Sequence, residues 1–105
     1  MIKPSNNTEV RVLFFARAPV EGRVKTRFIP EVGVKGALAL HQQLIELTWQ
    51  RISGHEQWVV ELWMSEPGQE QWFARLCPPD QMFVQQGEDL GERMHHALND
   101  ALQRS

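Results

Sequence analysis

The feature that most constrains the fold is a regular change in hydrophobic spacing along the chain. Residues 10–16 (VRVLFFA) form a nearly continuous apolar run, rich in β-branched and aromatic side chains, and residues 58–64 (WVVELWM) repeat this composition. Such short runs are typical of strands that are covered on both faces, as in a parallel sheet. Residues 82–84 (MFV) form a shorter run of the same kind, so we predict three strands.

Between these runs, apolar residues recur at helical spacing. Residues 34–53 are predicted to form a helix that ends before Gly54. The predicted buried stripe of this helix consists of Ala37, Leu40, Leu44, Leu47 and Ile52. A short second helix containing Trp72 and Phe73 is predicted to follow Ser65, which can cap it, and to stop at Pro78.

The last predicted helix begins at Asp89, a residue type that caps helices, with Glu92 three positions later. Its predicted buried stripe consists of Leu90, Met94, Ala97, Leu98 and Ala101. The order β-α-β-α-β-α predicts an α/β domain of the three-layer α/β/α type, in which three β-α units form a parallel sheet with right-handed crossovers.

Ligands of such sheets bind beyond the carboxyl ends of the strands. Two loops leave the predicted strands there, residues 17–30 after the first strand and residues 85–89 after the third, so both are candidate site segments. The length of 105 residues suits a single domain. We expect residues 1–9, which are mostly polar, to be a flexible N-terminus, and residues 10–105 to form the domain.

Charge and cysteine content narrow the partners and the compartment. Eleven basic and thirteen acidic residues give a net charge of −2, so no basic excess indicates binding to nucleic acid or to an anionic membrane. No apolar run approaches the roughly 20 residues that a membrane helix needs. Cys77 is the single cysteine, which excludes an internal disulfide and favours a reducing cytoplasm.

The loop after the first strand carries the clearest chemical signal. Its four cations are Arg17, Arg23, Lys25 and Arg27. Forked guanidinium groups, an ammonium group and loop N–H groups together can hold a phosphate or a diphosphate. A solvated charged loop is the simpler alternative. The loop is not a P-loop because Val24, and not glycine, precedes Lys25, and the chain has no Gly-x-Gly-x-x-Gly dinucleotide motif.

The second loop places Gly87 and Gly91 around the start of the last helix. Glycine permits a tight turn, and a helix N-terminus offers N–H groups to an anion. A helix that is merely capped by Asp89 and Glu92 is the alternative, and these two carboxylates would repel a phosphate unless a divalent metal lay between.

Residues 16–19 (ARAP), 24–27 (VKTR), 86–87 (QG) and 89–94 (DLGERM), with Gly22 and Pro30, resemble the two N-terminal motifs of a bacterial GT-A glycosyltransferase-like family of unknown function. That family is close to proteins named as arsenosugar-biosynthesis glycosyltransferases, and is similar, more distantly, to phospholactate guanylyltransferases. The resemblance spans residues 10–102. It implies a Rossmann-like, nucleotide-diphospho-sugar transferase-like fold whose first strand and loop hold the nucleotide.

The resemblance also implies a role for each matching position. Ala16, Arg17 and Ala18 would lie near the base and ribose, whereas Lys25 and Arg27 would neutralise the diphosphate as negative charge grows on it. The full set expected to bind nucleotide or phosphate is Ala16, Arg17, Ala18, Gly22, Lys25, Thr26, Arg27, Gln86 and Asp89. Gln86 and Asp89 would lie at the nucleotide's edge or behind it. No catalytic residue and no metal ligand is assigned.

Members of this family continue for about as many residues again, as a single α/β domain can. Their next strand carries a Gly-x-Asp-x-Pro-like motif whose acid binds a divalent metal, Mg²⁺ or Mn²⁺. This chain lacks that motif, so we expect it to be the N-terminal, nucleotide-binding half of a transferase, inactive alone, with a nucleoside diphosphate or nucleotide sugar as its partner.

Three alternatives to this function remain open. They are a non-catalytic nucleotide-binding or protein-interaction module, a nucleotidyltransferase-like fragment, and an inactive remnant that still folds. Without a fourth strand beside it, the first strand would form an apolar open edge, which predicts either self-association into a homo-oligomer or instability.

Overall fold

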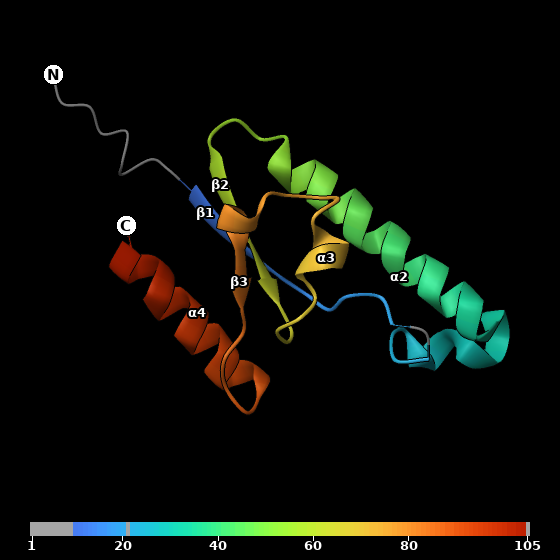
Figure 1. Cartoon of the computed structure of the whole chain (residues 1–105). Helices are drawn as coiled ribbons and strands as arrows, with labels where there is room; N and C mark the ends of the chain where they lie inside the picture. Colours follow the sequence, from blue (N-terminus) through green and yellow to red (C-terminus); the bar gives the residue numbers. More distant parts are fainter. Residues whose placement is uncertain (1–9, 21, 105) are drawn as a thin grey trace, which may run out of the picture.

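The computed structural model describes residues 10–20 and 22–104, and it confirms the α/β fold (Figure 1). Three parallel strands form one sheet in the order β1-β2-β3: β1 is Val10–Ala16, β2 is Trp58–Met64 and β3 is Met82–Val84. The predicted strand boundaries are therefore confirmed. The predicted flexible segment, residues 1–9, lies outside the described residues.

Helices connect the strands and follow the last one. They are α2 (Ile29–Ser53), α3 (Glu70–Phe73) and α4 (Leu90–Arg104), with short 3₁₀ turns η1 (Thr26–Phe28) and η2 (Pro79–Gln81). In the described part of the chain, no helix has the length and hydropathy needed to cross a membrane.

The strand register sets the position of the loops. Ala16 pairs with Met64, and Met64 pairs with Val84, so the three strands end level with one another. The segments that leave these strands therefore start side by side at one edge of the sheet. This is the edge at which ligands bind in open parallel sheets.

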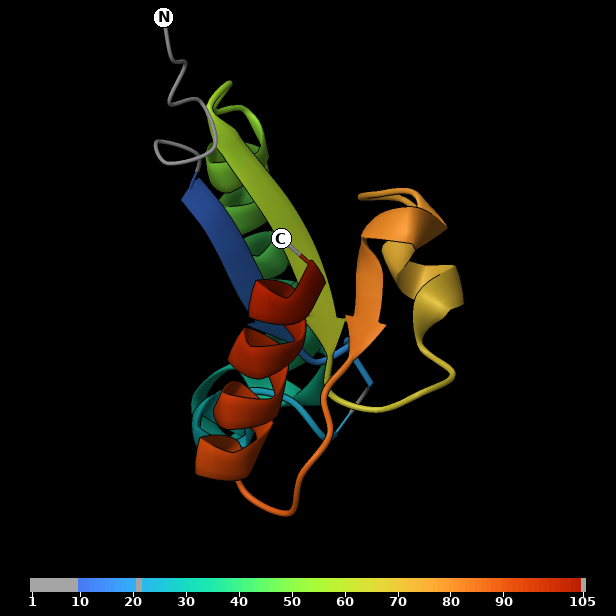
Figure 2. The same cartoon turned by 90° about the vertical axis from the view of Figure 1, so that its left-hand side faces the viewer.

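The two faces of the sheet are covered by different helices (Figure 2). On one face, Phe14 of β1 lies against Trp49 of α2, with ring centroids 6.3 Å apart, inside a buried core. On the other face, Trp63 of β2 lies between Phe15 and Phe83, with centroids 6.3 and 4.9 Å away, beneath α4. Aromatic residues therefore pack on both faces of the sheet.

The α4 face also holds a buried charge. Glu61 of β2 accepts hydrogen bonds from Arg11 at 2.6 Å, from Arg104 at 2.9 and 3.0 Å, and from the indole N–H of Trp63 at 3.0 Å. Burial alone would raise the pKa of Glu61, but these hydrogen bonds outweigh it and the pKa lies below its usual value. The carboxylate thus ties β1 and α4 to the central strand.

The predicted stripe of α2 is partly wrong. The buried side chains are Ala37, His41, Ile45 and Trp49, while Leu44 and Leu47 are exposed. The helix is rotated so that a histidine and a tryptophan, rather than the leucines, face the sheet. Gly33 interrupts the helix with φ 80°, so its continuous part begins at Val34, as predicted.

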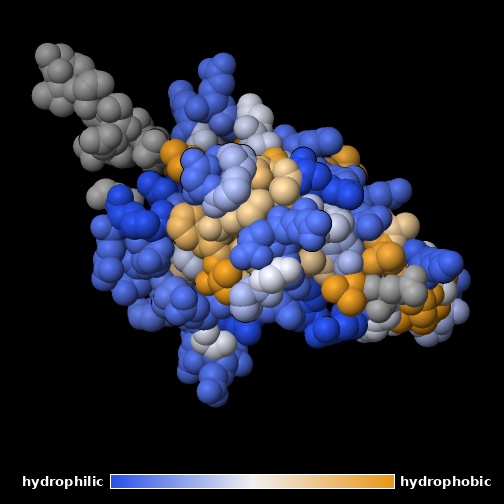
Figure 3. All heavy atoms as spheres, viewed as in Figure 1, coloured by the Kyte–Doolittle hydropathy of each residue, from blue (hydrophilic) through white to orange (hydrophobic). Residues whose placement is uncertain are grey.

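Apolar side chains are also exposed around the start of α2 (Figure 3). These residues are Val20, Phe28, Val32 and Val34.

Two further predictions about local structure need correction. In α4, Ala97 and Ala101 are buried, but Leu90, Met94 and Leu98 are exposed, because that flank of the helix extends past the sheet. Ser65 does not cap α3, which begins four residues after Glu66; instead its hydroxyl lies 3.3 Å from the side-chain oxygen of Gln69.

Candidate functional site

An open cavity of about 420 Å³ lies at the carboxyl ends of the three strands. Arg17 follows β1, Ser65 follows β2 and Gln85 follows β3, and all three line it. The remaining lining residues are Phe15, Ala16, Glu88, Asp89, Leu90 and Arg93. The cavity therefore combines an apolar wall with groups of both charges, as small-molecule sites commonly do.

The loop after β1 is held by a histidine from α2. The Nε2 atom of His41 lies 2.7 Å from the carbonyl oxygen of Arg17, and its Nδ1 atom lies 2.7 Å from the ammonium group of Lys25. A carbonyl only accepts and an ammonium only donates, so the imidazole is the neutral form that carries its proton on Nε2. His41 thus fixes two points of the loop.

Burial lowers the pKa of His41, the hydrogen bond to the Arg17 carbonyl partly opposes this, and the charges of Lys25 and Arg17 lower it further. Lys25 itself has a left-handed backbone with φ 51°. Lys25 precedes η1, and its side chain contacts His41 of α2 and does not line the cavity.

The loop after β3 is held by its own following helix. The guanidinium of Arg93 donates to the carbonyl oxygens of Gly87 and Ser65, each at 3.0 Å, and to the side-chain oxygen of Gln85 at 3.2 Å. One arginine therefore joins the ends of β2 and β3 to the first turn of α4.

The predicted cap at Asp89 is confirmed, but Glu92 bonds to the residue before the cap and not to the cap itself. Asp89 Oδ1 accepts from the N–H of Glu92 at 2.8 Å, and the carboxylate of Glu92 accepts from the N–H of Glu88 at 2.9 Å. Gly87 has φ 141°, and a Cβ atom there would lie 2.8 Å from Cβ of Glu92 and 2.9 Å from N of Arg93. Only glycine fits this close approach.

The charged side chains around the cavity differ in how many hydrogen bonds they already make. Arg93 is partly buried and occupied by the three acceptors above, whereas Arg17 is exposed and its bond to the carbonyl oxygen of Arg23 is long, at 3.5 Å. Asp89 is occupied as the cap, and Glu88 is exposed. Arg17 is thus the cation best placed to turn toward an anion entering the cavity.

The structure brings together only part of the predicted site. Ala16, Arg17 and Asp89 line the cavity, and Gln86 is replaced there by its neighbour Gln85. The N–H of Ala18 donates to Gln69 at 3.3 Å, beside a separate cavity next to α3. The predicted residues that line neither cavity are Gly22, Lys25, Thr26, Arg27 and Gln86. Their roles stay predictions.

Sequence reasoning missed four residues that build the site, namely His41, Ser65, Gln85 and Arg93. Their positions depend on the strand register and on packing between distant segments. Arg93 belongs to the motif DLGERM and could have been singled out as the only cation in that loop segment.

The described residues do not fit a divalent metal. In residues 10–20 and 22–104, no three His, Cys, Asp or Glu side chains gather closely enough to hold one. Asp89 already caps α4, and burial, together with the charge of Asp80, raises the pKa of the Cys77 thiol to about 11.

No protein-family model matches the chain, and no curated protein matches it. One solved structure that does match is a "putative nucleotide-diphospho-sugar transferase" from Desulfovibrio desulfuricans G20, with a TM-score of 0.84 and 31% sequence identity. The match covers 93% of this chain and 43% of that chain, so this chain spans less than half of the solved one. The present chain has a nucleotide-diphospho-sugar transferase-like fold.

Proposed function

We propose that the chain binds a nucleoside diphosphate or a nucleotide sugar in the cavity at the carboxyl ends of its strands, as the nucleotide-binding part of a GT-A-type glycosyltransferase. The observation that carries this proposal is the level ending of β1, β2 and β3 around a polar cavity in a fold shared with a nucleotide-diphospho-sugar transferase. Ligands of open parallel sheets bind at this place.

The charges indicate which way the nucleotide lies. Glu88 and Asp89 at the α4 side would repel a diphosphate but can accept hydrogen bonds from ribose hydroxyls or base amino groups. Phe15 and Leu90 offer an apolar wall for the base. We therefore place the nucleoside at the α4 side and the diphosphate toward Arg17. This differs from the family resemblance, which implies a place for Arg17 near the base and ribose. The loop with Lys25 and Arg27 extends from Arg17.

In this arrangement, Arg17 stabilises the negative charge that develops on the diphosphate as a sugar is transferred, because a guanidinium binds phosphate oxygens in pairs. Lys25 and Arg27 contribute long-range attraction, or direct contact if the His41–Lys25 bond opens.

The test is a titration of the protein with UDP, GDP and CTP, with and without Mn²⁺, followed by amide chemical shifts. We expect saturable shifts at residues 16–18, 65 and 85–93. Arg17→Gln should weaken binding about tenfold or more, because a charge-assisted hydrogen bond is worth roughly 1.5–3 kcal/mol.

Arg51→Gln is the matched control, since Arg51 is an exposed arginine in the last turn of α2 and lines neither cavity described above. Absence of saturable shifts with every nucleotide, or equal affinities of the two variants, would refute the proposal. Shifts confined to residues 18–20 and 68–75 would move the site to the cavity beside α3.

A further inference from the structure

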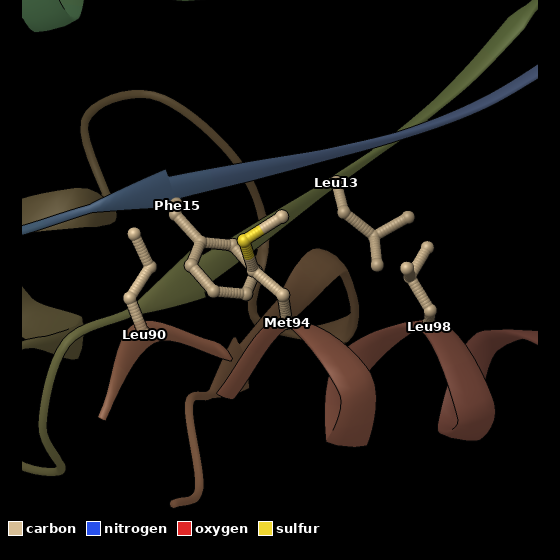
Figure 4. Close-up of a pocket in the computed structure, with 5 residues that line it drawn as sticks. All are labelled: Leu13, Phe15, Leu90, Met94 and Leu98. Carbon is tan, nitrogen blue, oxygen red and sulfur yellow. The ribbon is translucent and has the colours of Figure 1, made fainter. Parts of the chain in front are cut away.

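Two cavities flank the candidate nucleotide cavity, and they differ in polarity. The first, of about 290 Å³, lies between β1 and α4 and is lined by Leu13, Phe15, Leu90, Met94 and Leu98 (Figure 4). Its lining residues offer no polar side chain that would orient a ligand, and Phe15 and Leu90 also line the nucleotide cavity. This first cavity therefore extends the apolar wall of the candidate site, and we assign it no ligand of its own.

The second cavity, of about 490 Å³, lies between the loop after β1 and α3. Phe73 of α3 shares a buried core with Trp49 of α2, so this cavity lies on the α2 face of the sheet, opposite α4 (Figure 2). Its apolar lining includes Pro19, Val20 and Trp72, and its polar lining consists of Gln69, Gln71 and Arg75. No carboxylate lines it.

The amides of this cavity have unused hydrogen-bonding groups. Gln69 Oε1 accepts from the N–H of Ala18 and from the hydroxyl of Ser65, each at 3.3 Å. Because a backbone N–H only donates, the side-chain atom that faces Ala18 is the oxygen. Within residues 10–20 and 22–104, the amide nitrogen of Gln69 and the side chain of Gln71 have no hydrogen-bond partner. Both amides are therefore available to a ligand.

An arginine lies over a tryptophan in the same cavity. The guanidinium carbon of Arg75 lies 4.8 Å from the centre of the Trp72 ring, and its Nη1 atom donates to Glu46 of α2 at 3.3 Å. Trp72 in turn packs edge-on against buried Phe73, with ring centroids 5.0 Å apart. The bond to Glu46 uses one N–H group of the guanidinium, so the others can donate to a ligand beside the indole.

These groups fit a ring that carries several hydroxyl groups. A hydroxyl group both donates and accepts, so it can bond to the amides and to the guanidinium, while the C–H faces of a sugar ring can pack against Trp72, Pro19 and Val20. A cation would find no carboxylate among the lining residues. An anion would find only one guanidinium, which already pairs with Glu46. A carbohydrate ring is therefore the ligand class that matches this cavity.

The cavity beside α3 adjoins the nucleotide cavity. Arg17 lines the nucleotide cavity, and the next residue, Ala18, lines the cavity beside α3. Ser65 of the nucleotide cavity likewise bonds to Gln69 of the cavity beside α3. Consecutive Cα atoms are about 3.8 Å apart, so a sugar attached to a diphosphate at Arg17 can reach the cavity beside α3.

We propose that the cavity beside α3 binds a carbohydrate ring, with Gln69, Gln71 and Arg75 as its hydrogen-bond partners and Trp72 as its apolar wall. The proposal rests on the proposed function for the source of this ring. The ring is either the sugar of the nucleotide sugar or a separate carbohydrate acceptor, and both sources present the same hydroxylated ring.

The test is an amide chemical-shift titration of the full chain with three kinds of ligand. They are the diphosphates UDP and GDP, their glucose, galactose, N-acetylglucosamine and mannose conjugates, and the corresponding free methyl glycosides. If the ring belongs to the nucleotide sugar, the conjugates should add shifts at residues 18–20 and 68–75 that the diphosphates do not cause. If the ring is a separate acceptor, the glycosides should cause these shifts at up to about 50 mM, because so small a ligand binds weakly.

A single substitution separates carbohydrate binding from nucleotide binding. Gln71→Ala should weaken binding of the carbohydrate about fivefold, the effect of losing one hydrogen bond between neutral groups, and should leave the affinity for UDP and GDP unchanged. Gln103→Ala is the matched control, since Gln103 is an exposed glutamine of α4 and lines neither cavity.

The outcomes distinguish this proposal from the proposed function. If no conjugate or glycoside shifted residues 68–75, or if the two variants had equal effects, the carbohydrate site would be wrong while nucleotide binding could stand. Shifts at residues 68–75 with UDP or GDP alone would assign the cavity to the nucleotide and would also overturn the carbohydrate site. Glycoside binding without any nucleotide binding would keep the carbohydrate site and refute the proposed function.

Discussion

The loops after β1 and after β3 border the same cavity but are held in opposite ways. The first is fixed by His41, which lies 24 residues from Arg17 in the sequence, on α2. The second is fixed mostly by contacts within residues 85–93, through the cap at Asp89 and the bonds of Arg93 to Gly87 and Gln85, with one distant bond from Arg93 to the carbonyl oxygen of Ser65.

This difference shows which side of the cavity depends on packing between distant segments of the chain. Most bonds of the second loop are local, so its shape depends mainly on the first turn of α4, with the end of β2 adding the bond from Arg93 to Ser65. The first loop depends on how α2 packs against β1 and β2, so a shift of that helix changes the position of Arg17. We therefore expect the proposed phosphate side of the cavity to change position more easily than the proposed nucleoside side.

The largest effect is expected from a substitution in the locally held loop. Gly87→Ala places a methyl group against the backbone of α4 at a φ that disfavours side chains, so it should lower the free energy of unfolding by about 3 kcal/mol. Gly22 also has a positive φ, of 81°, but a Cβ atom there would meet nothing within 4 Å, so Gly22→Ala should cost about 1 kcal/mol.

Urea denaturation of both variants measures this contrast. Equal destabilisation would mean that backbone strain alone decides the cost, and that the close approach of Gly87 to Glu92 contributes nothing. A cost at Gly22 larger than at Gly87 would reverse the comparison between the two loops.

The second prediction concerns the loss of His41, which supports the first loop from α2. His41→Ala leaves the Arg17 carbonyl and the Lys25 ammonium without this partner and should lower the free energy of unfolding by about 2 kcal/mol. Amide exchange should rise at residues 17–28 and stay unchanged at residues 85–93. His95→Ala on the exposed surface of α4 is the control and should change neither segment.

If His41→Ala loosened both loops equally, the separation into a distant and a local support would be wrong. If it loosened neither, the bonds of His41 would be incidental to the shape of the loop.

The same contrast explains what the sequence could predict. The boundaries of all three strands and the cap at Asp89 follow from residues close together in the chain, and the structure confirms them. His41 was missed as a loop support because its partners are set by the packing of α2, which no local pattern encodes. The stripes of α2 and α4 were partly wrong because a sheet of three strands is too narrow to cover every apolar residue on both helices.

The smallest expected effect is a pH dependence that acts on the first loop alone. Burial and two neighbouring cations hold the pKa of His41 below its ordinary value in the folded protein, whereas the unfolded chain restores it to about 6.5. Protonation therefore favours the unfolded state, so this contribution to stability is complete above about pH 6.5 and is lost as the pH falls.

Between about pH 7.5 and 5.5, the wild type should lose more stability than His41→Gln, which cannot titrate there. Glu61 does not contribute to this difference, because its depressed pKa keeps it ionised throughout the interval. As the pH falls toward 5.5, amide exchange should rise at residues 17–28 and not at residues 85–93. Equal losses in the two proteins would show that His41 keeps its neutral form without any linkage to folding, and the first loop would then be as insensitive to pH as the second.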